Sequence, residues 1–120
     1  MDRWLCWGAV VSTAILPLLY VPLGLVRIVR GCRPARGYWR RRLILNLAEN
    51  NLGMALNVGL AAAAALAVDA DSGAAAGLLP VALAVNVLYT GLIVGFTPRD
   101  WWHALPTGIA AAEYAVVLFL

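Results

Sequence analysis

Long apolar runs constrain this chain more than any other feature of its sequence. Residues 5–26, 43–68 and 74–96 are each mainly apolar and long enough to cross a hydrocarbon core, which takes about 20 residues in a helix. A fourth run, residues 102–120, is only just long enough. We therefore predict an all-α membrane protein, a single transmembrane domain built as a bundle of four transmembrane helices with short loops.

The composition agrees with this assignment. Hydrophobic residues make up 63% of the 120 residues and charged residues only 12%, whereas soluble domains carry about 25% charged residues. The deficit of charge extends over whole segments, as expected when those segments lie in lipid.

The cationic residues are concentrated in one loop. The chain has no lysine, and seven of its nine arginines lie within residues 27–42. Positive residues favour the cytoplasmic side of a membrane, so this loop is expected in the cytoplasm and the amino terminus outside, most simply in a bacterial cytoplasmic membrane. This explanation requires no nucleic acid. Near a membrane surface each arginine contributes about 1 kcal/mol of attraction to anionic lipid. The candidate contacts with lipid head groups or a partner are Arg27, Arg30, Arg33, Arg36, Arg40, Arg41 and Arg42.

The second apolar run carries a polar stripe directly after three arginines. At 100° per residue, Asn46, Asn50, Gly53 and Asn57 share one helix face, and Glu49 lies at its edge. Polar side chains within a membrane span are costly unless another helix or water satisfies them. This helix is therefore expected to need packing partners.

Three polar residues are expected near the bilayer centre. With a rise of about 1.5 Å per residue, Asn57, Asn86 and Glu113 reach similar depths in their runs. A carboxylate at mid-depth costs roughly 2.5–3.5 kcal/mol on insertion scales, so it must be neutral, paired or beside water. Two interpretations remain open: a proton- or ion-coupled site, or polar contacts that hold the helices together.

The third run offers two different faces. Asn86, Tyr89 and Thr90 share one side, and Gly91 and Gly95 form a GxxxG pair on the other, where helices can approach closely. The candidate packing and polar residues are Asn46, Glu49, Asn50, Gly53, Asn57, Asn86, Thr90, Gly91, Gly95 and Glu113.

Signatures of catalysis and of metal binding are absent from the sequence. Cys6 and Cys32 lack CxxC spacing, and His103 is the only histidine. The nucleophile-elbow, P-loop, HExxH and GxGxxG motifs do not occur. We therefore expect neither an enzyme, nor catalytic residues, nor a bound metal or cofactor.

Three segments resemble, in part, the stage II sporulation protein M family of membrane proteins. Residues 49–52 (ENNL) are similar to the paired asparagines that open a span in that family, and residues 88–95 (LYTGLIVG) to its Tyr-Asn-Gly-Leu patch. Residues 105–109 (LPTGI), followed by Glu113, are similar to its Pro-His-Gly-Ile segment with a following glutamate. The resemblance implies a polytopic, non-enzymatic component of an envelope-remodelling or transport complex.

Three functions are compatible with these features. The first is a scaffolding subunit of a bacterial envelope or transport complex, which contacts other membrane subunits or copies of itself. The second is a small homo-oligomeric transporter or channel with a polar path through Asn57, Asn86 and Glu113. The third is an accessory subunit of an energy-converting or pigment complex, with His103 as a single ligand. The chain ends inside an apolar run, which leaves open whether Leu120 is the natural carboxyl terminus.

Overall fold

The computed structural model describes residues 1–31, 37–96 and 98–120. Within these ranges, the side chains that it does not describe are those of residues 16, 17, 19–29, 31, 38–51, 96, 99, 100 and 103. Over this part of the chain the protein is all-α and has no strand, as the sequence predicts. The elements are α1 (Asp2–Gly31), α2 (Tyr38–Asp69), α3 (Ala75–Phe96), the 3₁₀ helix η1 (Pro98–Ala104) and α4 (Leu105–Phe119).

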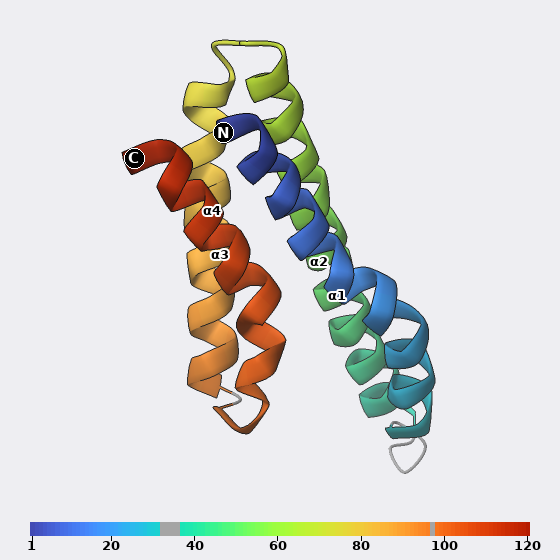
Figure 1. Cartoon of the computed structure of the whole chain (residues 1–120). Coiled ribbons are helices and arrows are strands. Elements are labelled where there is room, and N and C mark those ends of the chain that lie inside the picture. Colours follow the sequence, from blue (N-terminus) through green and yellow to red (C-terminus); the bar gives the residue numbers. More distant parts are fainter. Residues whose placement is uncertain (32–36, 97) are drawn as a thin grey trace.

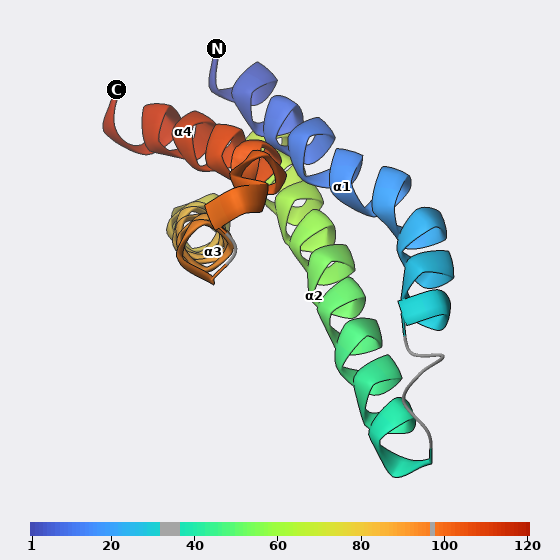
Figure 2. The same cartoon turned by 90° about the horizontal axis from the view of Figure 1, so that it is seen from below.

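The long first two helices extend into the predicted loop 27–42. Helix α1 begins with Asp2 in its first turn and has Arg30 in its last, charges that suit the helix dipole at each end. It continues through Pro17 and Pro22, and Figure 2 shows it bending along its length. Helix α2 begins after Gly37, whose φ of 64° suits a residue without a side chain. The loop between the helices is therefore shorter than the sequence pattern predicts.

A tight turn joins α2 to α3. The amide of Ala70 donates to the carbonyl of Leu66, and the amide of Ser72 donates to that of Ala67, which closes the end of α2. Asp71 has a φ of 50°, a conformation that aspartate tolerates better than most residues. At the other end of the molecule, Pro106 lies in the first turn of α4, where its missing amide hydrogen costs nothing.

The helices pack in a ring in which each has two neighbours. Helix α1 packs against α2 and α4, and α3 packs against α4 and α2. Figure 1 and Figure 2 show that α1 and α2 continue together beyond this region and diverge from α3 and α4. The molecule is accordingly elongated, with extents of 52 × 26 × 20 Å.

Small side chains dominate the interior. Alanines of α1, α2, α3 and α4 allow the helix backbones to approach closely, and Tyr114 is the largest side chain that is fully buried. The buried cluster comprises Cys6, Ala9, Ala61, Ala64, Ala65, Leu79, Ala82, Ala110 and Tyr114.

Two of the described helices are long and apolar enough to cross a membrane, by length and composition. These segments are Leu52–Asp69 in α2 and Ala75–Gly95 in α3. Helix α4 is apolar but has 15 residues, about 22 Å, against a hydrocarbon core of about 30 Å. The structure therefore confirms the four-helix, all-α architecture, and a crossing by all four helices stays a prediction.

Candidate functional site

Two buried asparagines join α2 to α3. The Asn57 Nδ2 donates to Asn86 Oδ1 at 3.1 Å, and the Asn86 Nδ2 donates to Asn57 Oδ1 at 3.3 Å. The same Asn86 nitrogen donates to the carbonyl of Ala82 at 2.8 Å. Both residues are buried, Asn86 completely. Each amide thus supplies both the donor and the acceptor that the other needs, as buried polar groups require.

Hydroxyl groups extend this polar contact from α3 to α4. Thr90 Oγ1 donates to the carbonyl of Asn86 at 2.8 Å and lies 2.9 Å from Thr107 Oγ1. Thr107 Oγ1 in turn bonds the carbonyl of Ala104 at 3.1 Å. A β-carbon at Gly108 would lie 3.9 Å from the Thr90 methyl, an ordinary van der Waals contact, so α4 and α3 also pack closely here. Asn57, Asn86, Thr90 and Thr107 therefore form a chain of polar contacts across three helices, here called the polar ladder.

Tyr89 makes a second contact between α2 and α3. A β-carbon built on Gly53 would lie only 2.6 Å from the Tyr89 hydroxyl oxygen. The absence of a side chain at Gly53 therefore makes room for the tyrosine hydroxyl. The helical periodicity predicts Gly53 on the same face as the asparagines, and the structure gives it a steric role.

Glu113 does not join the polar ladder. Its carboxylate lies between α4 and α1, where a β-carbon built on Gly8 would be 2.7 Å from Glu113 Oε1. The Oε2 atom is inaccessible and has no hydrogen-bond partner in the described part of the chain. The sequence suggests a polar path through Asn57, Asn86 and Glu113. In the structure the two asparagines lie between α2 and α3, whereas Glu113 lies between α4 and α1.

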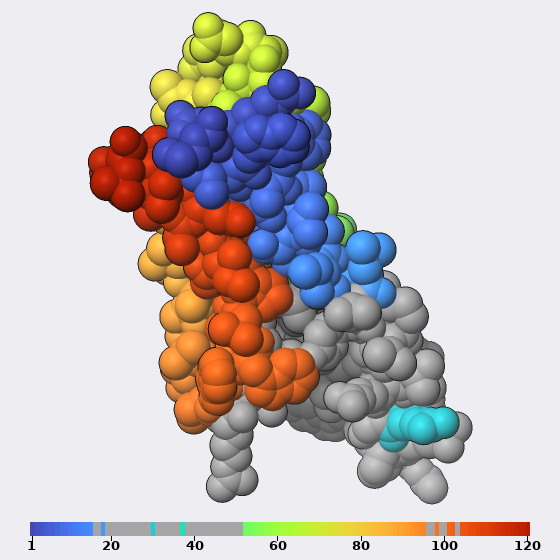
Figure 3. Space-filling model, in the orientation of Figure 1, coloured from blue at the N-terminus to red at the C-terminus, as the bar shows by residue number. Residues whose placement is uncertain are grey.

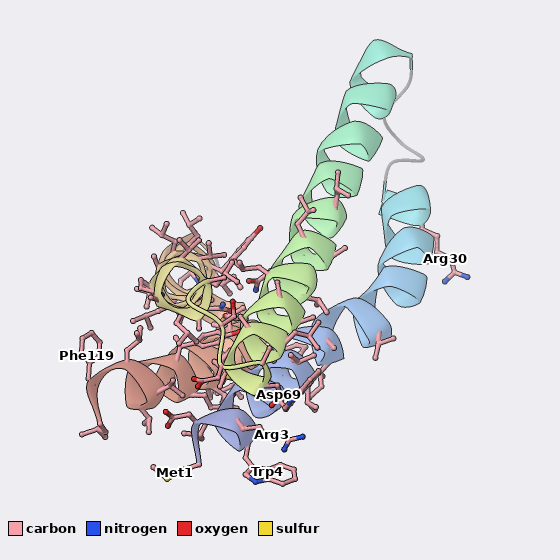
Figure 4. The ribbon with its side chains drawn as sticks, turned by 90° about the horizontal axis from the view of Figure 1, so that it is seen from above. Met1, Arg3, Trp4, Arg30, Asp69 and Phe119 are labelled. Atoms are coloured by element: carbon pink, nitrogen blue, oxygen red, sulfur yellow. The ribbon has the colours of Figure 1, made fainter. Side chains whose placement is uncertain are left out.

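A charged contact marks the end of the molecule near the α2–α3 turn. Arg3 Nε lies 2.8 Å from Asp69 Oδ1, and the Trp7 indole Nε1 donates to Asp69 Oδ2 at 2.9 Å. Figure 4 labels Arg3 and Asp69 close together and Arg30 far from both. Arg3 is 67% exposed, so its ion pair contributes at most about 1 kcal/mol, less in salt.

The glycine pair of α3 lies on the outside. Gly91 and Gly95 are exposed, and a β-carbon at either position would meet nothing within 4 Å. A shallow pocket of about 350 Å³ lies beside Leu88 and Leu92, and another of about 340 Å³ lies between α3 and α4 at Thr90. The described side chains that line both pockets are mostly apolar. No group of three or more potential metal ligands occurs among the described residues.

Several predicted site residues have side chains outside the described part of the structure. Arg30 is described and is exposed near the end of α1. The others are Arg27, Arg33, Arg36, Arg40, Arg41, Arg42, Asn46, Glu49, Asn50, and the candidate ligand His103.

Sequence reasoning did not identify three of the contacts described above. Gly8 received no role, although an isolated glycine in an apolar helix often marks a close approach. The sequence gives Thr107 only a place in the LPTGI segment of the resemblance and gives Tyr114 no role, yet Thr107 is buried in the polar ladder and Tyr114 in the core. Their burial depends on how α4 is rotated, which its uniformly apolar sequence does not specify.

Comparisons of the chain with protein-family models, curated proteins and solved structures found no match. The resemblance to the sporulation protein M family accordingly stays a prediction.

Proposed function

We propose that this chain is a non-enzymatic membrane subunit that assembles with other membrane helices as a scaffold in a bacterial envelope or transport complex. The observation that carries the proposal is the distribution of side chains, with small and polar residues inside and large apolar residues outside. Water-soluble proteins bury their large apolar residues, so this pattern favours a lipid or protein environment around the helices.

The two apolar segments illustrate the distribution. Only 28% of Leu52–Asp69 and 17% of Ala75–Gly95 is buried within the chain. The core helix of a soluble protein is mostly buried, so these segments resemble membrane helices more closely. Among the described side chains, the exposed large apolar residues of α2 and α3 are Leu52, Leu56, Leu66, Val81, Val87, Leu88, Leu92 and Val94.

The outer face of α3 suits contact with a further helix. Gly91 and Gly95 share it with Gly77 and Ala84, which are also exposed. Gly77, Ala84 and Gly91 recur every seven residues, the spacing of a seam between helices that cross at a shallow angle. A neighbouring membrane subunit, or a second copy of this chain, would bury this seam.

The polar ladder supports a structural rather than a conducting role. Asn57 and Asn86 satisfy each other and are nearly inaccessible, so they bind helices together and leave little surface for a passing solute. Glu113 lies at a different interface. A transport path would need these groups to face a shared, open space.

From their charges, we expect the two ends of the molecule on opposite sides of the proposed membrane. The arginine-rich loop 27–42 would lie in the cytoplasm beside anionic lipid or a partner, and the α2–α3 turn with Asp69 and Asp71 would lie outside.

The direct test is purification of the native chain in mild detergent, with mass spectrometry of the proteins that co-migrate. Recovery with other membrane subunits at a fixed ratio is the expected result. Recovery alone as a homo-oligomer would argue for the transporter instead, and recovery as a monomer would contradict both assignments.

A variant of the α3 seam tests which surface makes the contact. Gly91→Leu adds a side chain where nothing within this chain obstructs it, so the fold should remain while partners are lost from the purified complex. Gly59→Leu is the matched control, because Gly59 of α2 is equally exposed and lies off the seam. Equal loss of partners in both variants would show that the α3 seam is not the contact.

A further inference from the structure

Helices α1 and α4 enclose an acidic group at their interface. Figure 3 shows the two helices side by side over one face of the molecule. The Glu113 carboxyl lies directly against the backbone of Gly8, since a β-carbon there would be 2.7 Å from Oε1, 3.2 Å from Cδ and 3.5 Å from Oε2. Glu113 is half-buried as a residue, but its Oε2 has no accessible surface.

A second polar atom at this interface is also enclosed. The Tyr114 side chain is completely buried, and its hydroxyl has no hydrogen-bond partner among the described residues. Cys6 of α1, a buried free thiol, belongs to the same buried cluster as Tyr114. The surroundings are otherwise apolar and small, with Ala9 and Ala110 in the same cluster.

Glu113 forms no ion pair with a cation in the described part of the chain. Arg3 is engaged with Asp69, and Arg30 lies at the far end of α1 (Figure 4). The side chains of Arg99, Asp100 and His103, which belong to η1, are outside the described part of the structure. Among the described side chains, the other titratable groups on the helices around this interface are Asp2 and Cys6 of α1, Asp69 of α2, Tyr89 of α3 and Tyr114 of α4.

The enclosure determines what can bind. Burying an ionised carboxylate oxygen without a hydrogen-bond donor or water beside it costs several kcal/mol of free energy. At Oε2, which has no accessible surface, a metal ion or an amine has no space to bind. A proton needs no space and removes the charge. We infer that the α1–α4 interface is a proton-binding site, in which the Glu113 carboxyl, seated on Gly8, holds a proton while α4 is docked on α1.

The site is separate from the scaffold function and has its own test. Infrared spectroscopy of the purified full chain distinguishes the carbonyl stretch of a protonated carboxyl from the bands of carboxylates. At neutral pH we expect this stretch in the unmodified chain and its complete loss in Glu113→Gln, which keeps the shape of a neutral carboxyl. Glu49→Gln is the matched control, because residue 49 is the only other glutamate in the sequence. It should leave the band unchanged.

Two results would overturn the inference: the unmodified chain has no protonated-carboxyl band, or the band persists in Glu113→Gln. A measurement on the unmodified chain covers the case in which the variant does not fold. Dicyclohexylcarbodiimide dissolves in lipid and adds to protonated carboxyls, and mass spectrometry locates the adduct. An adduct at Glu113 in preference to the exposed Asp2 and Asp71 supports the site. Modification of these aspartates with none at Glu113 contradicts it.

Discussion

Among single residues, Asn57 and Asn86 have the clearest energetic consequence. Asn86→Ala removes both interhelical amide bonds and the bond to Ala82, whereas Asn57→Ala leaves Asn86 its bond to that carbonyl. Losing a partner of a buried polar group costs about 1–3 kcal/mol, although coupling between helices in membranes averages about 0.6 kcal/mol. We expect both variants to be destabilised, Asn86→Ala more than Asn57→Ala.

Denaturation in detergent micelles measures this effect. The double variant should be less destabilised than the sum of the single variants, with a coupling of about 1 kcal/mol, because neither amide is then left without its partner. Strictly additive effects would show that the amides do not interact.

Gly53 makes a steric prediction at the same scale. Gly53→Ala places a β-carbon 2.6 Å from the Tyr89 hydroxyl oxygen, so the tyrosine must shift, at a cost of about 1 kcal/mol. In a Tyr89→Phe background the next atom is 3.9 Å away, and the cost should disappear. Thermal unfolding in detergent measures both. Gly59→Ala serves as the control in the same helix. An equal loss of stability from Gly53→Ala in the Tyr89→Phe background and in the unmodified chain would exclude this contact.

Among elements, the α3–α4 pair is the most directly testable. Thr90 and Thr107 have hydroxyl oxygens 2.9 Å apart, which places their β-carbons near the separation of about 3.5–4.5 Å that a disulfide bridges. With Cys6 and Cys32 replaced by alanine, we expect Thr90→Cys and Thr107→Cys to cross-link under mild oxidation, as mass spectrometry of the intact chain would detect. The pair Thr107→Cys and Gly91→Cys, in which Gly91 lies on the outer face of α3, should give much less of the cross-linked product. Equal cross-linking of the two pairs would contradict this packing.

The same elements show what the sequence can and cannot predict. Apolar run length predicts the cores of α2 and α3 well, because the polar residues that end each run also end the helix soon afterwards. It predicts the bounds of α1 and the start of α2 less well. A helix can continue through arginines beyond the apolar run, because arginine does not disrupt the backbone hydrogen bonds of a helix. Counting residues along each run predicts that Asn57 and Asn86 lie at a similar depth, and the structure pairs them. Depth does not specify helix rotation, and rotation determines that Glu113 faces Gly8 instead.

At the scale of the whole molecule, the structure has a closely packed end and a diverging end. Alanine-rich packing and the contacts of Asp69 lie towards the α2–α3 turn, while the end of α1 and the start of α2 lie away from α3 and α4 (Figure 1). The region that holds the four helices together is therefore distant from the region expected to meet lipid or a cytoplasmic partner.

The difference between the two ends of the molecule predicts how the chain is oriented in the membrane, and labelling of cysteines can test this orientation. Cys6 is completely buried, so a membrane-impermeant thiol reagent should report Cys32 alone. Because positive loops favour the cytoplasm, Cys32 should be labelled only after the membrane is permeabilised. Ser72→Cys in a Cys32→Ala background places a thiol at the exposed α2–α3 turn, which should be labelled in intact cells. Labelling of Cys32 in intact cells, with protection of the cysteine at position 72, would require the opposite orientation and would place the arginines outside.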